Sequence, residues 1–419
     1  MKHLIQLLFY ICLSVSWVIT APSDDSDGCI ACHQIIDEDR DDDEKIMTHI
    51  MEDVHFQKGL SCSDCHGGNP NAGDDEDEAM WDADDFVGAV DKKDQPRFCG
   101  KCHSDPEYMR QYSAHLKTDQ ESQYWSSHHG QKLSENDEHV AVCTDCHGVH
   151  GIYPIKDPRS LVYHMNVPTT CKRCHSDKDI MANSGLPTDQ FDKYKSSVHG
   201  TALFDKKDIG APACNDCHGN HGAMPPTILS ISDICGTCHA NNAELFKGSH
   251  LREIFIKENI KLCEGCHNYH DIQKPTDESL DWSENETCSH CHPNDQDKAK
   301  NLSNALFNII DSLNIKIEEA NETVDLAENK GMEVSELFFS LEDAHKNLIQ
   351  TRTSIHSFNE EFVRKTSEDG YKAADAAIIG AEQVLTEFGF RKKGLIVFSL
   401  ILTFFVIVLY LKIKSMENK

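Results

Sequence analysis

The sequence predicts a mainly α-helical and irregular fold, in which a cysteine-rich domain precedes a helical hairpin or bundle and one C-terminal transmembrane helix. Three observations predict this order. Cysteines recur in close pairs up to residue 291, apolar residues then recur at helical spacing, and an uncharged apolar run follows near the C-terminus. The expected boundaries are a signal peptide at 1–21, a cysteine-rich domain at 22–296, a helical stalk at 297–390, a transmembrane helix at 394–411 and a cytoplasmic tail at 412–419.

The N-terminus has the layout of a secretory signal peptide. Lys2 gives a basic start, an apolar stretch runs from Leu4 to Ile19, and the small residues Thr20 and Ala21 precede an acidic chain. We expect cleavage near these two residues; an uncleaved anchor is the alternative. In both cases the chain that follows is expected outside the cytoplasmic membrane, on the periplasmic side.

Beyond the leader, all eighteen remaining cysteines form nine pairs that read C-x-x-C-H, the attachment signature of a c-type haem. The two thiols bond covalently to the haem, and the adjacent histidine ligates the iron from one side. Zinc sites and disulfides also use paired cysteines, but neither requires a histidine directly after every second cysteine. In chain order, motifs 1 to 9 are Cys29/Cys32/His33, Cys62/Cys65/His66, Cys99/Cys102/His103, Cys143/Cys146/His147, Cys171/Cys174/His175, Cys214/Cys217/His218, Cys235/Cys238/His239, Cys263/Cys266/His267 and Cys288/Cys291/His292. We therefore predict nine haems c as cofactors.

The chain contains enough histidines to fill the sixth coordination position of every haem iron. A haem iron whose sixth position is filled by histidine is closed to substrate, which suits low-potential electron transfer. Besides the nine proximal histidines, the cysteine-rich region holds thirteen others: His49, His55, His115, His128, His129, His139, His150, His164, His199, His221, His250, His270 and His290. Histidine at both axial positions of all nine irons is therefore arithmetically possible.

An internal repeat ranks these distal ligands. Motif 5 follows motif 3 by 72 residues, and motif 6 follows motif 4 by 71, with similar strings between them. Two groups of preferred distal ligands recur in the repeat: His129, His199 and His250 share a place upstream of a motif, and His150, His221 and His270 each follow a proximal histidine by three residues. The other preferred candidates are His49, His55 and His115. We expect the residues at plus three to reach a neighbouring haem. Lower in the ranking are His128, His139, His164, His345 and His356, and His290 inside motif 9 is not expected to be a ligand.

These strings, CHGVHG and CHGNHG beside SSHHG and SSVHG, resemble the low-potential multihaem cytochromes c with a doubled C-x-x-C-H module. The resemblance covers about residues 29–295. It implies stacked haems with histidine on both sides of the iron and little regular secondary structure. No C-x-x-C-K motif occurs, such as marks the open haem of pentahaem nitrite reductases, which argues against that activity.

The chain is strongly acidic, with a formal net charge of −30, which disfavours nucleic acid and anionic membrane surfaces as partners. Two acidic runs stand out, at 37–44 and 74–78. We interpret them as solvated loops. A Ca²⁺ site built from carboxylates and a docking surface for a basic redox partner are the alternatives.

After residue 296 the pattern becomes helical. One apolar stripe runs from Leu302 to Ala327 and ends at Gly331, a second runs from Leu337 to Ile355, and Asn359 is placed to cap a third helix. The eighteen uncharged residues at 394–411 give about 27 Å of helix, close to the thickness of a bilayer core. Basic residues flank both ends of this run, so the signal peptide decides the orientation, with a single span and the haem domain outside.

The sequence thus favours an electron-transport protein of respiration, an electron-transfer subunit of an oxidoreductase complex rather than an enzyme by itself. It would carry electrons between a quinol-oxidising or quinone-reducing membrane partner, of cytochrome b or iron–sulfur type, and soluble or outer-surface cytochromes. The alternative is a terminal reductase of a small nitrogen or sulfur oxyanion, with one open haem.

Overall fold

The computed structural model describes residues 27–38, 45–73, 75–225, 233–282, 286–289, 291–292 and 297–418. Within these ranges the chain is helical and irregular without a β-strand, which confirms the predicted fold class. The predicted leader with Cys12, residues 39–44 and 74 of the acidic runs, and His290 lie outside the described residues. The chain divides into two compact units, Met1–Pro226 with His270–Ile272, and Thr227–Tyr269 with Gln273–Lys419. Each is described by itself.

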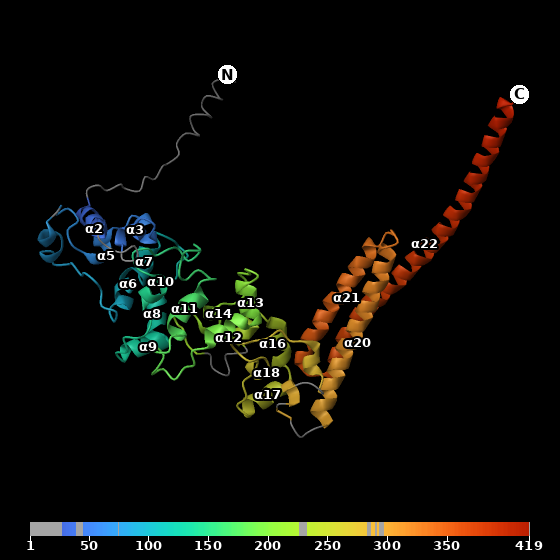
Figure 1. The fold of residues 1–419 in the computed structure, drawn as a ribbon. Helices are drawn as coiled ribbons and strands as arrows, with labels where there is room; N and C mark the ends of the chain where they lie inside the picture. Colours follow the sequence, from blue (N-terminus) through green and yellow to red (C-terminus); the bar gives the residue numbers. More distant parts are fainter. Residues whose placement is uncertain are drawn as a thin grey trace, which may run out of the picture. The chain divides into compact units, whose positions relative to one another are not determined.

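The first unit consists of short helices joined by irregular loops (Figure 1, blue to green). The longest has eleven residues, and many are a single turn. They are α2 (Gly28–Glu38), α3 (Ile46–Ile50), α4 (Val54–Gln57), α5 (Cys62–His66), the π-helix η1 (Asp77–Trp81), α6 (Gln95–His103), α7 (Pro106–Met109), α8 (Gln120–Ser126), α9 (His128–Ser134), α10 (Cys143–His147), α11 (Val167–His175), α12 (Gln190–Ser196), α13 (Val198–Phe204) and α14 (Cys214–His218).

Apolar side chains contribute little to the interior of this unit. Its two buried clusters are small: one is centred on Tyr124 and Leu133, the other on Val167 and Leu203. Short helices of this kind are not stable without tertiary packing. The first unit therefore needs another source of buried surface.

The second unit contains motifs 7 to 9 and the helical bundle. Its elements are α16 (Ala240–Lys247), α17 (His250–Lys257), α18 (Glu264–His267), the 3₁₀ helix η2 (Asp277–Leu280), α19 (Glu286–Ser289), α20 (Asp297–Glu328), α21 (Ser335–Ser354), the 3₁₀ turn η3 (Ile355–Ser357) and α22 (Glu360–Glu417). The last three long helices pack side by side (Figure 1, orange to red).

The bundle follows the predicted apolar stripes. Leu313, Ile317 and Val324 of α20 are essentially inaccessible to solvent and pack against Leu341, Ala344 and Leu348 of α21 and against alanines of α22. Gly331, with φ of +71°, follows the end of α20 as predicted. The N-cap at Asn359 is also confirmed, because its side chain accepts the Phe362 N–H at 3.0 Å.

Helix α22 runs without a break from the bundle into the apolar run and projects beyond α20 and α21 (Figure 1). Its 58 residues correspond to about 87 Å. Large apolar side chains from Leu395 to Leu411 are exposed. Among the described residues α22 is the one helix whose length and composition suit a membrane span, as the sequence predicted.

Candidate haem sites

Motifs 2, 4 and 6 each form one isolated helical turn from the first cysteine to the histidine. The aspartate before the second cysteine closes this turn. Asp64, Asp145 and Asp216 accept the backbone N–H of the residue before the motif, at 2.6, 2.8 and 2.7 Å. The glycine after each histidine, with φ of +68°, +81° and +84°, then ends the turn. The local string C-x-D-C-H-G therefore presents two thiols and an imidazole from a single turn.

Motifs 3 and 5 are built differently. Each occupies the C-terminal end of a nine-residue helix, α6 or α11, which begins with a buried proline in its first turn, Pro96 or Pro168. The alternation of two helical contexts along the chain matches the 71–72-residue repeat.

Consecutive motifs lie beside one another. The first cysteines of motifs 3 and 4, of motifs 5 and 6, and of motifs 7 and 8 interact directly through their thiols. The second cysteines of motifs 2, 4 and 8 lie close to the cysteines of the next motif along the chain. Within each unit the attachment points therefore follow the order of the sequence.

The two cysteines of a motif differ in their exposure to solvent. The first cysteine is partly buried in every motif, and in motifs 3 to 8 it packs against the first cysteine of a neighbouring motif. The second cysteine is partly buried in motifs 4 and 5 but exposed in the other seven. The exposed second cysteines are Cys32, Cys65, Cys102, Cys217, Cys238, Cys266 and Cys291. The predicted attachment residues are therefore not a uniformly buried set, although the second cysteines of motifs 2, 4 and 8 also lie close to cysteines of the next motif.

The proximal histidine of motif 7 also differs from most of the others. His239 is exposed, as is His292, whereas the proximal histidines of motifs 1 to 6 and 8 are partly buried. No glycine ends the turn after His239, which instead caps α16 and accepts the Ala243 N–H with its carbonyl at 3.0 Å. Its role as the iron ligand of motif 7 stays a prediction from the C-x-x-C-H string.

At least six of the nine proximal histidines face a second imidazole. Two imidazoles that ligate one metal at about 2 Å each have ring centres about 6 Å apart. The six observed pairs, with their ring-centre distances, are His66 and His150 (5.8 Å), His103 and His55 (5.9 Å), His147 and His221 (6.1 Å), His175 and His129 (6.2 Å), His218 and His270 (5.9 Å), and His267 and His356 (6.2 Å). The spacing fits an iron held between the two rings of each pair.

The pairs follow a regular offset. His150, His221 and His270, which come three residues after the proximal histidines of motifs 4, 6 and 8, face the proximal histidines of motifs 2, 4 and 6. Each thus faces the motif two places earlier in the chain and not its own motif. His55 and His129 instead face motifs that come later in the chain. His55 precedes motif 2 and faces the proximal histidine of motif 3, and His129 precedes motif 4 and faces that of motif 5.

One comparison with known proteins bears on these sites. A family model described as the doubled CXXCH motif matches residues 207–244, which carry motifs 6 and 7. The match supports a multihaem c-type cytochrome. No curated protein and no solved structure matches the chain.

Three of these imidazoles are oriented by hydrogen bonds at Nδ1. The Nδ1 atom of His66 lies 2.8 Å from the Gly88 carbonyl, that of His55 lies 3.0 Å from the Asp53 carboxylate, and that of His356 lies 3.0 Å from the Thr353 carbonyl. A proton on Nδ1 that is donated to such an acceptor leaves Nε2 free to ligate a metal. Burial also lowers the pKa of both His129 and His147 to about 4, which favours the neutral, metal-binding form.

The S-S-x-H-G string places a distal histidine in the first turn of a helix. Ser127 is buried, donates its hydroxyl to the Tyr124 carbonyl at 2.6 Å and accepts the Gly130 N–H at 3.0 Å, so that it caps α9. A Cβ on Gly130 would clash with the same carbonyl oxygen. The serine and the glycine thus fix the backbone on both sides of His129.

Helix α13 repeats this cap around His199. Ser197 donates its hydroxyl to the Tyr194 carbonyl at 2.6 Å and accepts the Gly200 N–H at 3.1 Å. His250 departs from the repeat by one residue. It directly follows Ser249, the residue that precedes α17, whereas His129 and His199 lie two residues after their serines.

Several other histidines have surroundings unlike those of the paired ones. His164 has its Nε2 atom 2.8 Å from the Ala211 carbonyl, and the exposed His345 lies 3.3 Å from the amide of Asn321. The side chains of His49, His115, His128, His139 and the preferred candidate His250 are also exposed. Among the described residues, no second imidazole faces His33 or His292.

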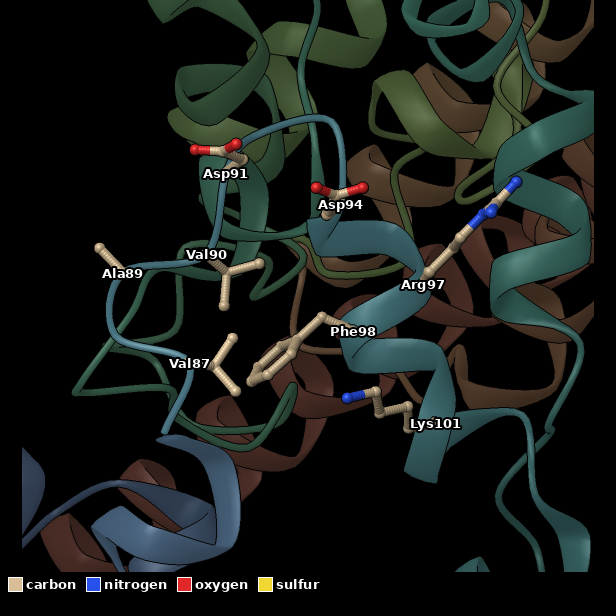
Figure 2. A pocket seen from close by; sticks show the side chains of 8 residues that line it. All are labelled: Val87, Ala89, Val90, Asp91, Asp94, Arg97, Phe98 and Lys101. Atoms are coloured by element: carbon tan, nitrogen blue, oxygen red, sulfur yellow. The ribbon is translucent and has the colours of Figure 1, made fainter. Parts of the chain in front are cut away.

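A shallow cavity lies beside motif 3 (Figure 2). Val87 and Val90 on the preceding loop approach Phe98 and Lys101 of α6, and Asp91, Asp94 and Arg97 rim the opening. Half of the residues that line this cavity are charged, and Phe98 directly precedes Cys99, so the cavity borders motif 3.

Calcium was the alternative interpretation of the acidic runs. Within the described residues, no group of three or more His, Cys, Asp or Glu side chains is arranged to hold a metal ion. Since most of the run at 37–44 lies outside these residues, the calcium site stays a prediction.

Proposed function

We propose that this cytochrome carries nine haems c and transfers electrons between a membrane partner and soluble or outer-surface cytochromes. Haem iron supplies one-electron redox chemistry when it is bound. The cysteines of each motif would attach the haem, and the opposed histidines would ligate its iron. The observation that carries the proposal is the set of six opposed histidine pairs on motifs that lie side by side in chain order.

The opposed pairs support electron transfer over substrate turnover. An iron with histidine on both sides has no open position for a small ligand, so the sites suit electron passage alone. We expect electron paramagnetic resonance (EPR) of the oxidised protein to be dominated by low-spin ferric haem. A large high-spin signal that responds to nitrite or sulfite would contradict the proposal.

The haem number has a direct test. Intact-mass spectrometry of the mature protein should show nine haem additions, and peptide mapping should place one on each C-x-x-C-H motif. Motifs 7 and 9 are the most informative, because in each the second cysteine and the following histidine are both exposed. A mass without haem, or with zinc in its place, would overturn the cofactor assignment for the motifs concerned.

The membrane side of the proposal rests on the apolar part of α22 and on the signal-like N-terminus. We infer a single span, with the haem domain outside the cytoplasmic membrane and a partner that oxidises quinol or reduces quinone. Native membranes that contain the cytochrome should show quinol-dependent reduction of its visible haem bands. Protease added outside sealed spheroplasts should release the haem domain; protection from that protease would reverse the topology.

A reductase with one open haem remains the second candidate, and one observation favours a particular place for it. No second imidazole faces His33 of motif 1 among the described residues, and its buried Nδ1 atom has no hydrogen-bond partner there. Replacing Cys29 and Cys32 together with alanine removes that haem. If a high-spin signal exists in the wild type and disappears in this variant, motif 1 is the open site and the reductase gains support.

A further inference from the structure

We propose that His356, in the turn between two helices of the bundle, is the sixth ligand of the haem attached at motif 8. The inference rests on the proposed function only in requiring haem at Cys263 and Cys266. It makes the bundle part of a haem site rather than a spacer between the haem domain and the membrane.

The geometry of this pair matches the five pairs within the first unit. The ring centres of His267 and His356 are 6.2 Å apart and their planes differ by 23°. The other five pairs span 5.8 to 6.2 Å. Both imidazoles are half-buried. An iron therefore fits between His267 and His356 as well as it fits in any pair built from the repeat.

The hydrogen bonds of His356 present the correct nitrogen. Its Nδ1 atom lies 3.0 Å from the Thr353 carbonyl in the last turn of α21, which can accept a proton from Nδ1. The amide nitrogen of Asn242 on α16 lies 3.3 Å from the same atom, but as a donor it offers no second acceptor. With its proton donated to Thr353, Nδ1 is committed, and Nε2 keeps its lone pair for a metal.

The regular offset of the repeat provides no histidine to face His267 of motif 8. Motifs 2, 4 and 6 are each faced by the plus-three histidine of the motif two places later. For motif 8 that donor would belong to a tenth motif, and no cysteine follows Cys291. His356 takes the place that the regular offset cannot fill.

The bundle is held firmly at this point. Arg352 of α21 forms two hydrogen bonds with Asp277, at 2.8 and 2.5 Å, and Ser303 of α20 donates to the Leu280 carbonyl at 2.5 Å. Both acceptors belong to η2, which follows motif 8 in the chain. Phe358, in the left-handed region with φ of +51°, packs against Phe246 with ring centres 6.3 Å apart. These contacts fix η3 against the segments that flank motif 8.

The test compares His356→Ala with His345→Ala in the full-length cytochrome in detergent. His345 is matched, because it lies on α21, is exposed and faces no proximal histidine. We expect His356→Ala to keep its haem number by mass spectrometry but to gain one high-spin ferric haem by EPR, which added imidazole returns to low spin. His345→Ala should retain the wild-type spectrum.

A second variant keeps the test valid if alanine prevents folding. His356→Met supplies another ligand and should give one methionine-ligated haem, with its near-infrared charge-transfer band and a raised potential. Wild-type spectra and potentials in both His356 variants, with haem present on motif 8, overturn this inference alone. The absence of haem from Cys263 and Cys266 in the wild type overturns the proposed function at this motif instead.

Discussion

His221 shows how one imidazole can join two parts of the haem region. It follows His218 of motif 6 by three residues, yet its ring lies 6.1 Å from that of His147 in motif 4, with the planes within 7° of parallel. The glycine after His218 has φ of +84°, which turns the chain away from motif 6. A single turn can thus attach one haem and ligate another, which makes neighbouring sites interdependent.

Replacing His221 with methionine should change one haem without detaching any haem from its cysteines. Both thioethers and the proximal His147 remain, but methionine favours the reduced iron more than histidine does. We expect one couple to rise by on the order of 0.1 V, a fraction of the range that axial ligands cover. Spectroelectrochemical titration measures this shift, and His139→Met, at an exposed residue, is the control. An unchanged titration curve would remove His221 from the ligand set.

Replacing Gly130 with alanine should disturb the haem of motif 5. The new Cβ would clash with the Tyr124 carbonyl oxygen, so the first turn of α9 must move and carry His129 away from His175. We expect a lower yield of haem-loaded protein, and a high-spin fraction of about one haem in the protein that survives. Gly248→Ala is the control, because its Cβ would make ordinary contacts near 3.7 Å. Equal yields and spectra for both variants would contradict this account.

Sequence reasoning could find most of the paired histidines but not their partners. The plus-three position and the S-S-x-H-G string marked His150, His221, His270 and His129 because both recur in the repeat. The offset of two motifs depends on how turns pack in space, which a linear string does not contain. His356 lies outside the repeat, so only the packing of η3 near motif 8 brings it to His267.

At the scale of elements, the bundle and the haem region obey different rules. Helices α20 and α21 follow from apolar spacing alone, since Leu306 to Ala327 and Leu341 to Leu348 are buried where the stripes predict. The short helices of the first unit carry no such stripe. Their limits are set by caps such as Asp145 and by glycines of positive φ, which composition and periodicity do not reveal.

Truncation of a core leucine should destabilise the bundle. Leu313 is fully buried among α20, α21 and α22, so Leu313→Ala should cost about 3 kcal/mol through lost contacts and a cavity. Ile315→Ala, at a side chain that is 56% exposed, should cost less than about 1 kcal/mol. Thermal unfolding followed by circular dichroism in detergent measures the difference. Similar melting temperatures for the two variants would mean that the stripe is not the core.

At the scale of the whole molecule, haem must supply what the first unit lacks. Its apolar clusters contain only three or four buried residues each, over roughly two hundred described residues. Too little apolar surface is buried there to offset the conformational entropy of ordering the chain. The bundle, by contrast, has fourteen buried residues in one cluster.

Expression without the haem-attachment machinery should therefore leave the bundle folded and the first unit unfolded. We expect residues 27–225 to be degraded or unprotected in hydrogen exchange, while α20 to α22 keep slowly exchanging amides. Full-length protein made with the machinery provides the comparison. A protected, cooperatively unfolding first unit without haem would show that the chain has a core of its own.

The part of α22 that precedes its apolar run offers a test of the proposed membrane partner. From Glu360 to Gly394 the helix spans about 50 Å, so η3 and His356 are held at roughly that distance along the helix from the apolar run. Inserting seven helix-forming residues after Phe390 adds about 10 Å and two turns. We expect slower quinol-dependent reduction in membranes with unchanged haem spectra. An equal rate would mean that the length of α22 before the apolar run does not control how electrons enter the haem region.

The unbroken α22 also couples orientation in the bilayer to lateral reach. Membrane helices commonly tilt by about 20° from the bilayer normal, and a straight 50 Å arm tilted by that angle carries its tip sideways by about 17 Å. Because α22 continues into the bundle without a hinge, rotation of a tilted span about the normal sweeps η3 around a circle of that radius. If the proposed partner lies in the plane of the membrane, this rotation alone brings η3 to any point on that circle.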